Sequence, residues 1–343
     1  MVTKSNGPVI RMREVVAVVV LLAILWAVLI PVILASREKA RRSQCEDNLK
    51  ALGVAFLSHE ILTHRFPPSC HVMKDADGGI TSMDGWSWCV DLMLSLDQGD
   101  LWLSLDMEGG APLRPNADGS GSHAAALATP VARLRCPSFG GRPFVGDSDV
   151  EAITNYKAMG ATHLESLNVA SPNPTTPRYA PESDRHPDGG IYPGSTHGVR
   201  GFKTDGTART ILIVETVEQN VARWTVGNEC AVVGLPPVVE FDNGEAGYDA
   251  LIGYTPNKHW DESTIPPEKD KTYLEWDYDA APYSDGGAST PSAHASGPMK
   301  YGPSSHHDGV TNHLFADGSV HPVGNGIDAA LYMFLITRSN CDP

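Results

Sequence analysis

One uninterrupted apolar run, residues 15–34 (VVAVVVLLAILWAVLIPVIL), constrains this chain more than any other feature. It contains no charged residue, and twenty residues in a helix rise about 30 Å, the thickness of a bilayer's hydrocarbon core. The chain holds no second run of this kind. A cleavable secretory signal is the competing interpretation, but such signals have a shorter apolar stretch ending in a small-x-small site. Ile33-Leu34-Ala35 is a poor site of that type, so we expect a single anchor in the lipid bilayer.

The distribution of charge restricts the kinds of partner that the rest of the chain can bind, but it does not determine the orientation of the chain across the membrane. Three basic residues precede the apolar run and four follow it closely, so the positive-inside rule gives no clear answer. The net charge is −15, and residues 1–50 carry eight basic against four acidic side chains, which leaves −19 for residues 51–343. So acidic a portion repels phosphate backbones, which argues against nucleic acid as a partner. An acidic surface that keeps the protein soluble explains the charge, and binding of cations or basic surfaces is the alternative.

The six cysteines are scattered and form neither a CxxC pair nor a zinc-type spacing. Disulfides in an exported protein are compatible with this pattern, and so are six buried thiols. The sequence gives no connectivity among Cys45, Cys70, Cys89, Cys136, Cys230 and Cys341.

Helical periodicity continues beyond the apolar run. Residues 35–62 contain no proline, and Leu49, Leu52 and Phe56 recur at three- to four-residue spacing. We therefore expect one helix over residues 15–62, kinked at Pro31 because proline has no N–H to donate. The segment Arg65-Phe66-Pro67-Pro68 should end it.

The rest of the chain favours short strands, and the whole is predicted to be α+β. Residues 86–105 look partly helical, whereas residues 211–215, 231–233, 238–241 and 310–316 are β-type runs. Two stretches rich in Pro, Gly, Asp and Ser, residues 172–195 and 261–298, look like loop insertions.

The last clear element is a predicted hairpin. Asp317-Gly318 separates the apolar runs 310–316 and 319–323, and this dipeptide favours a two-residue type I′ turn with φ > 0 at both positions. That register places Phe315 opposite Val320 and His313 opposite Pro322, with His313 and His321 on opposite faces.

At this point the motifs match a known family. His307, nine residues and then Asp317-Gly318 form an H-x9-D-G motif, and further blocks occur in a fixed order. The chain thereby resembles the bacterial prepilin-like proteins of unknown function that begin with a pilin-type methylation helix. The further blocks are PVILASREKARRSQC from Pro31 to Cys45, Asn48-Leu49-Lys50, Arg65 to Pro68, Trp86-Ser87-Trp88 with residues 92–101, Leu134-Arg135-Cys136-Pro137-Ser138, Asn155-Tyr156, and Asp205-Gly206-Thr207 with residues 211–215.

The resemblance implies a long helix packed on a mainly antiparallel β body exported to the cell envelope, and it supplies no established activity. It also implies pilin-like insertion, with the N-terminus cytoplasmic and other pilin-like subunits or envelope proteins as partners. The expected division is a cytoplasmic segment (1–14), a transmembrane helix (15–34), its amphipathic continuation (35–64) and an extracytoplasmic domain (65–343).

The N-terminus departs from the pilin pattern. Alignment on Pro31 puts Glu14 at the fifth mature position, but Val9 then stands where the peptidase requires glycine, and Ile10 follows the bond. We therefore expect no processing and a permanent anchor. Glu14 has two interpretations: pairing with a neighbouring subunit's N-terminal ammonium, or with Arg11 or Arg13 at the interface.

A histidine cluster at residues 306–321 suggests a metal or hydrolytic site, because imidazoles and carboxylates bind Zn²⁺. The predicted register separates His313 from His321, and Asp317 is explained by the turn, so we interpret His307 as a buried hydrogen-bonding residue. Acidic loops at residues 75–79 and 242–245 lack a full calcium-loop spacing. No catalytic motif is present.

The sequence thus predicts a non-enzymatic, pseudopilin-like envelope protein without cofactor or metal. An anchored metal protein or hydrolase using the 306–321 region is one alternative, and a glycan-binding module using exposed tryptophans is another. The residues expected to be structurally important are Glu14, Pro31, Cys136, Asp205, Gly206, His307, Asp317 and Gly318.

Overall fold

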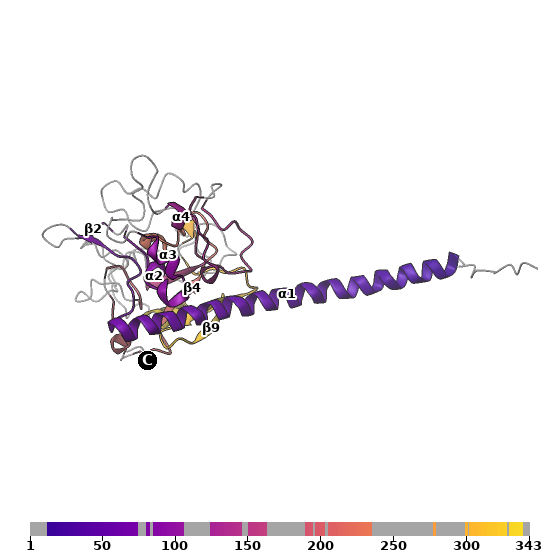
Figure 1. Ribbon diagram of the computed structural model, residues 1–343. Helices are drawn as coiled ribbons and strands as arrows, with labels where there is room; N and C mark the ends of the chain where they lie inside the picture. Colours follow the sequence, from indigo (N-terminus) through magenta and orange to yellow (C-terminus); the bar gives the residue numbers. More distant parts are fainter. Residues whose placement is uncertain are drawn as a thin grey trace, which may run out of the picture. The chain divides into compact units, whose positions relative to one another are not determined.

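The computed structural model (Figure 1) describes residues 12–74, 80–82, 85–105, 124–145, 150–162, 189–194, 196–202, 205–234, 277–278, 299–300, 302–327 and 329–338. The chain divides into two compact units, residues 1–43 and 44–343. The class is α+β, as expected, with a long helix followed by a β body. The predicted strand 238–241 and most of the two predicted loop insertions lie outside the described residues.

Helix α1 (Met12–Thr63) is continuous over 52 residues and confirms the expected single helix. It continues through Pro31, and the size of any bend there stays a prediction. Its end is set by His64, whose φ of 59° is left-handed and whose N–H donates to the Glu60 carbonyl at 2.7 Å. This is a C-terminal cap closed by a non-glycine residue, and the prolines that follow prevent continuation.

The body is built on one five-stranded mixed sheet of order β5-β3-β4-β8-β9. Three of its four pairings are antiparallel, and β3–β5 is parallel. The strands are β3 (Tyr156–Ala161), β4 (Ile211–Glu215), β5 (Ala231–Val233), β8 (Val310–Phe315) and β9 (Val320–Gly324). Two small pairs accompany it: β1 (Met73–Lys74) with β2 (Ile80–Ser82), and β6 (Asp277–Tyr278) with β7 (Met299–Lys300).

Short helices fill the connections. The expected helical character of residues 86–105 is confirmed by α2 (Trp88–Asp91), η1 (Leu94–Leu96) and α3 (Gly99–Leu103). The others are α4 (Ala124–Leu127), η2 (Ala132–Leu134), η3 (Val199–Phe202), η4 (Gly227–Glu229) and α8 (Ala329–Ile336).

Both faces of the sheet are covered. On one face, the part of α1 within the second unit buries the predicted Leu49, Leu52 and Phe56 completely, in a core shared with Trp88 and Leu314. Full burial of each such side chain is worth about 1.5–3 kcal/mol. A separate core joins the other face to α8 through residues including Phe315, Tyr332 and Met333.

At Gly53, helix α1 packs closely against the β8–β9 hairpin. A Cβ at Gly53 would lie 2.8 Å from Leu314 Cδ1 and 3.2 Å from Gly318 Cα. Glycine costs about 1 kcal/mol relative to alanine inside a helix. Here it allows the helix backbone to pack against the hairpin turn.

The predicted hairpin exists, but its predicted turn type and register are wrong. His313 pairs with His321 and Leu314 with Val320, so the two histidines share a face. Gly318 has φ of 86°, whereas Ala316 and Asp317 do not have positive φ, and Gly318 N–H donates to Phe315 O. A type I turn followed by a left-handed glycine explains the observed register, because it makes a three-residue connection.

Candidate functional site

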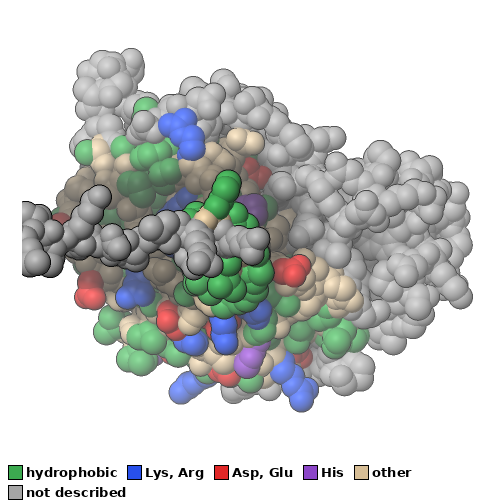
Figure 2. Space-filling view, turned by 90° about the vertical axis from the view of Figure 1, so that its right-hand side faces the viewer, with side chains coloured by type: hydrophobic (Ala, Val, Ile, Leu, Met, Phe, Trp, Pro, Cys, Tyr) green, Lys and Arg blue, Asp and Glu red, His purple; other side chains and the backbone are tan. Residues whose placement is uncertain are grey.

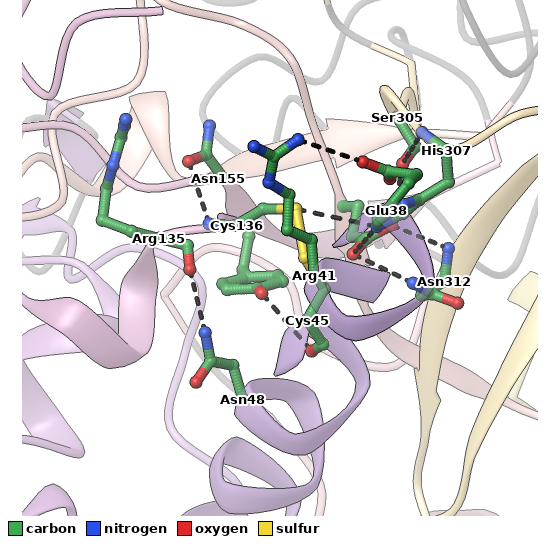
Figure 3. The surroundings of a disulfide bond; sticks show 12 residues. Glu38, Arg41, Cys45, Asn48, Arg135, Cys136, Asn155, Ser305, His307 and Asn312 are labelled. Atoms are coloured by element: carbon green, nitrogen blue, oxygen red, sulfur yellow. Dashed lines mark hydrogen bonds and ion pairs between the residues drawn. A yellow bond between two sulfur atoms is a disulfide. The ribbon is translucent and has the colours of Figure 1, made fainter. Parts of the chain in front are cut away.

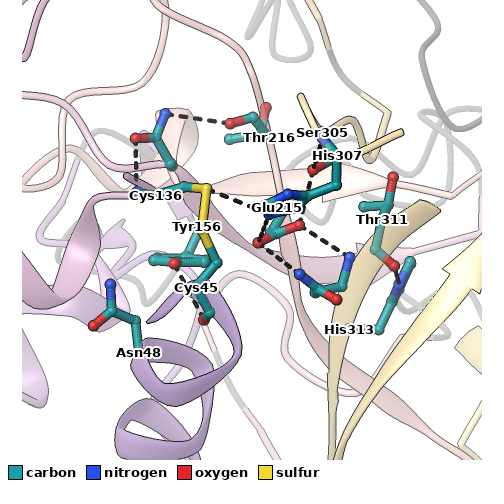
Figure 4. Close-up of polar contacts among 12 residues, drawn as sticks. Cys45, Asn48, Cys136, Tyr156, Glu215, Thr216, Ser305, His307, Thr311 and His313 are labelled. Atoms are coloured by element: carbon teal, nitrogen blue, oxygen red, sulfur yellow. Dashed lines mark hydrogen bonds and ion pairs between the residues drawn. A yellow bond between two sulfur atoms is a disulfide. The ribbon is translucent and has the colours of Figure 1, made fainter. Parts of the chain in front are cut away.

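A buried carboxylate, Glu215, stands at the end of β4. All five residues of that strand are buried, and Glu215 is 1% exposed. One of its oxygens accepts hydrogen bonds from Ser305 Oγ and Asn312 N, both at 3.0 Å, and the other accepts from Asn312 Nδ2 at 3.1 Å (Figure 4). These three donors compensate for the loss of water, which a buried charge requires.

Beside this carboxylate lies a disulfide between Cys45 of α1 and Cys136, which follows η2 (Figure 3). Its Cα atoms are 5.2 Å apart, and 91 residues separate the cysteines in sequence. Cys136 N–H donates to Asn155 Oδ1 at 3.1 Å, and Asn48 Nδ2 of α1 donates to Arg135 O at 2.9 Å. The helix is thus joined to the body by one covalent bond and by a neighbouring hydrogen bond.

His307 lies between the carboxylate and the disulfide. Its Nε2 is 3.5 Å from Glu215 Oε1 and 3.7 Å from Cys136 Sγ, and its side chain is 1% exposed. Its backbone N–H donates to Ser305 Oγ at 3.1 Å. The expected burial of His307 is therefore confirmed, whereas its hydrogen bond to the turn or to an adjacent strand stays a prediction.

These four side chains converge on one point. Ligand atoms of Cys45, Cys136, Glu215 and His307 all lie within 4.8 Å of one another, and all four residues are buried. We call this group the disulfide cluster. Glu215 also acts on the nearby Tyr156. The pKa of this phenol is raised, chiefly by burial and secondly by the negative charge of Glu215.

The other histidines of the 306–321 region do not join the disulfide cluster. His313 is fully buried against Tyr332, whose hydroxyl is 2.7 Å from His313 Nε2, while the ring of His321 packs on Phe315. His306 is exposed, and its ring lies 5.6 Å from that of Phe139. The predicted separation of His313 and His321 by register is wrong, yet each of them has a different partner.

The remaining predicted residues have local roles. Asp317 accepts a hydrogen bond from Ser319 N at 2.8 Å, which explains it as a turn residue. Gly206 has φ of 87° in the turn before β4, next to Asp205. Glu14 belongs to α1, but its side chain lies outside the described residues, as do both candidate calcium loops.

Three tryptophans belong to the core. Trp86 is 5% exposed, and Trp88 and Trp224 are fully buried. They are unavailable for stacking on a glycan, which confirms core packing for these three. Trp260 and Trp276 lie outside the described residues.

Sequence reasoning singled out Cys136 and His307 but missed their partners Cys45 and Glu215 as members of one site. The only local signal was a glutamate closing an otherwise apolar strand, ILIVE. A charge at the end of so buried a run requires partners, and that requirement could have marked Glu215.

A family model covers most of the chain, including every member of the disulfide cluster. Residues 35–330 match the model of a family described as "Protein of unknown function (DUF1559)". The chain belongs to this DUF1559 family. The match begins beyond the apolar run, so the pilin-type helix and the motif details stay predictions. Neither a curated protein nor a solved structure matches the chain.

The DUF1559 membership and the apolar helix are consistent with a membrane-anchored or secreted protein. Within the described residues, one helix is long and apolar enough to cross a membrane, and it lies near the N-terminus, where signal sequences also occur.

Proposed function

We propose that this DUF1559 protein is a single-span, pseudopilin-like envelope protein with a non-enzymatic role in secretion, adhesion or surface assembly. The observation that carries the proposal is the exposure of the apolar part of α1. Within the first unit none of its most apolar window is buried, and large side chains such as Leu21 and Trp26 are 66% and 59% exposed. Green hydrophobic side chains gather near the centre of the face shown in Figure 2. So large an exposed apolar surface requires lipid or a protein partner.

The disulfide cluster supports a structural role for the body. A catalytic acid and base must reach a substrate, whereas the Glu215 and His307 side chains are 2% and 1% exposed. The same cluster joins helix and body covalently, as suits a protein whose helix stays in the membrane. In our proposal the N-terminus is cytoplasmic and the body extracytoplasmic, where a disulfide persists.

The proposal is tested by measuring the intact mass of the protein in membranes of its native host and its extraction from those membranes. We expect the full-length mass with residues 1–9 retained, and resistance to extraction by alkaline carbonate. A soluble chain cleaved shortly after residue 34 would instead identify a signal peptide and contradict the anchor.

A matched variant tests the role of Val9. In Val9→Gly the glycine required by a prepilin peptidase is restored, so we expect cleavage before Ile10 in the variant only. Cleavage of the wild type at the same bond would mean that Val9 is accepted, and subunit assembly would then become the leading function.

A further inference from the structure

We infer that the disulfide cluster is a zinc-class metal site whenever the Cys45–Cys136 bond is reduced. The donor set carries this inference. Reduction would release two thiolates beside an imidazole and a carboxylate, and these are the ligand types that Zn²⁺ takes in four-coordinate protein sites. The 2Cys-His-Glu set comes from four separate places in the chain, so no sequence spacing reveals it.

The spacing of the donor atoms suits a tetrahedral ion. Ligands at about 2.0–2.3 Å from zinc lie about 3.3–3.8 Å from one another. His307 Nε2 already lies 3.5 Å from Glu215 Oε1 and 3.7 Å from Cys136 Sγ. All four donor atoms lie within 4.8 Å of one another, so binding requires the two sulfurs to separate after their bond opens and any spacing above about 3.8 Å to shorten.

The surroundings hold these donors in place, as partners of metal ligands do. Ser305 and Asn312 fix the Glu215 carboxylate, and Asn155 holds the Cys136 backbone. The charges are also compatible with a metal, because a divalent cation would reduce the combined −3 charge of two thiolates and one carboxylate to −1 inside the buried site.

The redox step is balanced with a dithiol as reductant. The dithiol transfers two electrons and two protons, the S–S bond breaks, two thiols form, and the dithiol becomes a cyclic disulfide. Zinc then binds the two thiols as thiolates and releases two protons. The bound ion would keep α1 joined to the sheet while the covalent bond is open.

The experiment uses the full chain in detergent, with a phosphine reductant that does not compete for metal. The phosphine supplies the same two electrons and becomes its oxide with the oxygen of a water molecule, whose two protons go to the sulfurs. After incubation with Zn²⁺ and desalting, we expect one retained zinc per reduced chain and none per oxidised chain. His307→Gln should weaken binding by at least about tenfold. His313→Gln, which removes an equally buried histidine outside the cluster, should retain the metal.

Other thiols provide the decisive control. Cys45→Ser/Cys136→Ser retains Cys70, Cys89, Cys230 and Cys341 and should hold no zinc. Zinc in this double variant, equal zinc in the oxidised chain, or none in the reduced wild type would overturn the inference.

The unfolding midpoint is a second measurement, and it tests whether the reduced chain keeps its structure. We expect zinc to raise the unfolding midpoint of the reduced wild type and of His313→Gln, but not of His307→Gln. A reduced chain that unfolds and does not refold with zinc would also overturn the inference. Co²⁺ in place of zinc should give thiolate-to-metal absorption in the same two proteins.

Discussion

His313 on β8 is a buried histidine whose two ring nitrogens both have partners. Nδ1 lies 2.8 Å from Thr311 O and Nε2 lies 2.7 Å from the Tyr332 hydroxyl. This pattern fits a neutral ring that donates from Nδ1 and accepts at Nε2. Burial lowers the pKa of His313 to about 4, so the folded protein resists its protonation.

The first prediction is a loss of stability in acid. Because the folded pKa lies below the ordinary value of 6.5, the contribution is fully present above pH 6.5 and declines as the pH falls toward about 4. The expected decline in unfolding free energy from this group is at most about 3 kcal/mol. Denaturant unfolding at pH 7 and pH 4 measures it.

Two variants isolate the effect. His313→Gln should lose less stability between these pH values than the wild type, whereas His321→Gln, at an exposed histidine paired with His313, should behave like the wild type. Equal slopes for His313→Gln and the wild type would exclude His313 as the source.

The second prediction separates conformational strain from packing at two glycines. Gly318 and Gly206 have φ of 86° and 87°, but a Cβ at Gly318 would lie 3.1 Å from Leu57 Cδ1 of α1, whereas Gly206 has open space around it. We expect Gly206→Ala to cost about 1 kcal/mol, from backbone strain alone. Gly318→Ala should cost more, and equal unfolding free energies for the two variants would contradict a tight contact.

At the residue scale, the sequence could identify side chains but not their partners. His307 and Cys136 were recognised, and the burial of His307 was expected. Glu215 and Cys45 were missed because each lies far along the chain from its partner: residue numbers 215 and 307 differ by 92, and 45 and 136 differ by 91. Such contacts depend on topology, which local patterns do not contain.

At the scale of elements, the disulfide joins helix α1 to the segment that follows η2. It closes a long loop, so it removes much conformational freedom from the unfolded chain. The third prediction is that reduction without metal, or Cys45→Ser/Cys136→Ser, lowers the unfolding free energy by about 4–5 kcal/mol in the chain-entropy model.

A reductant titration provides the control for this prediction. Adding the same reductant to the double variant should leave its unfolding midpoint unchanged, because the other described cysteines, Cys70, Cys89 and Cys230, are thiols already. A further drop in the double variant would reveal a second disulfide.

Periodicity predicted the elements better than it predicted their pairing. Residues 211–215 and 231–233 became β4 and β5 with the expected bounds, and the helical pattern of α1 was correct. The hairpin register was off by one because Asp-Gly allows both a two-residue type I′ turn and a three-residue loop with one left-handed glycine. In the folded protein Gly318 lies close to Leu57 of α1, a tertiary contact that the local sequence does not contain.

At the scale of the whole molecule, the chain consists of a short N-terminal unit and a much larger body. The second unit begins at Gln44, one residue before the disulfide. The fourth prediction is that a chain starting at residue 36 is soluble and unfolds cooperatively, with the Cys45–Cys136 bond intact by mass spectrometry. Its unfolding free energy should equal that of the body in the full chain, because the removed residues supply no described core residue.

Either of two results would contradict this prediction. Aggregation of the shortened chain, or a lower denaturation midpoint than in the detergent-solubilised full chain, would mean that residues 1–35 contribute to folding of the body.

The position of the disulfide also determines how a pulling force would travel through the protein. If the membrane holds the helix and a partner pulls on the body beyond residue 136, the tension passes from Cys45 directly across the sulfur bridge. The intervening residues 46–135, which include α2, η1 and α3, then bear none of the tension carried along the backbone. The disulfide therefore bypasses residues 46–135. Reducing it would add those residues to the part of the chain that carries the tension.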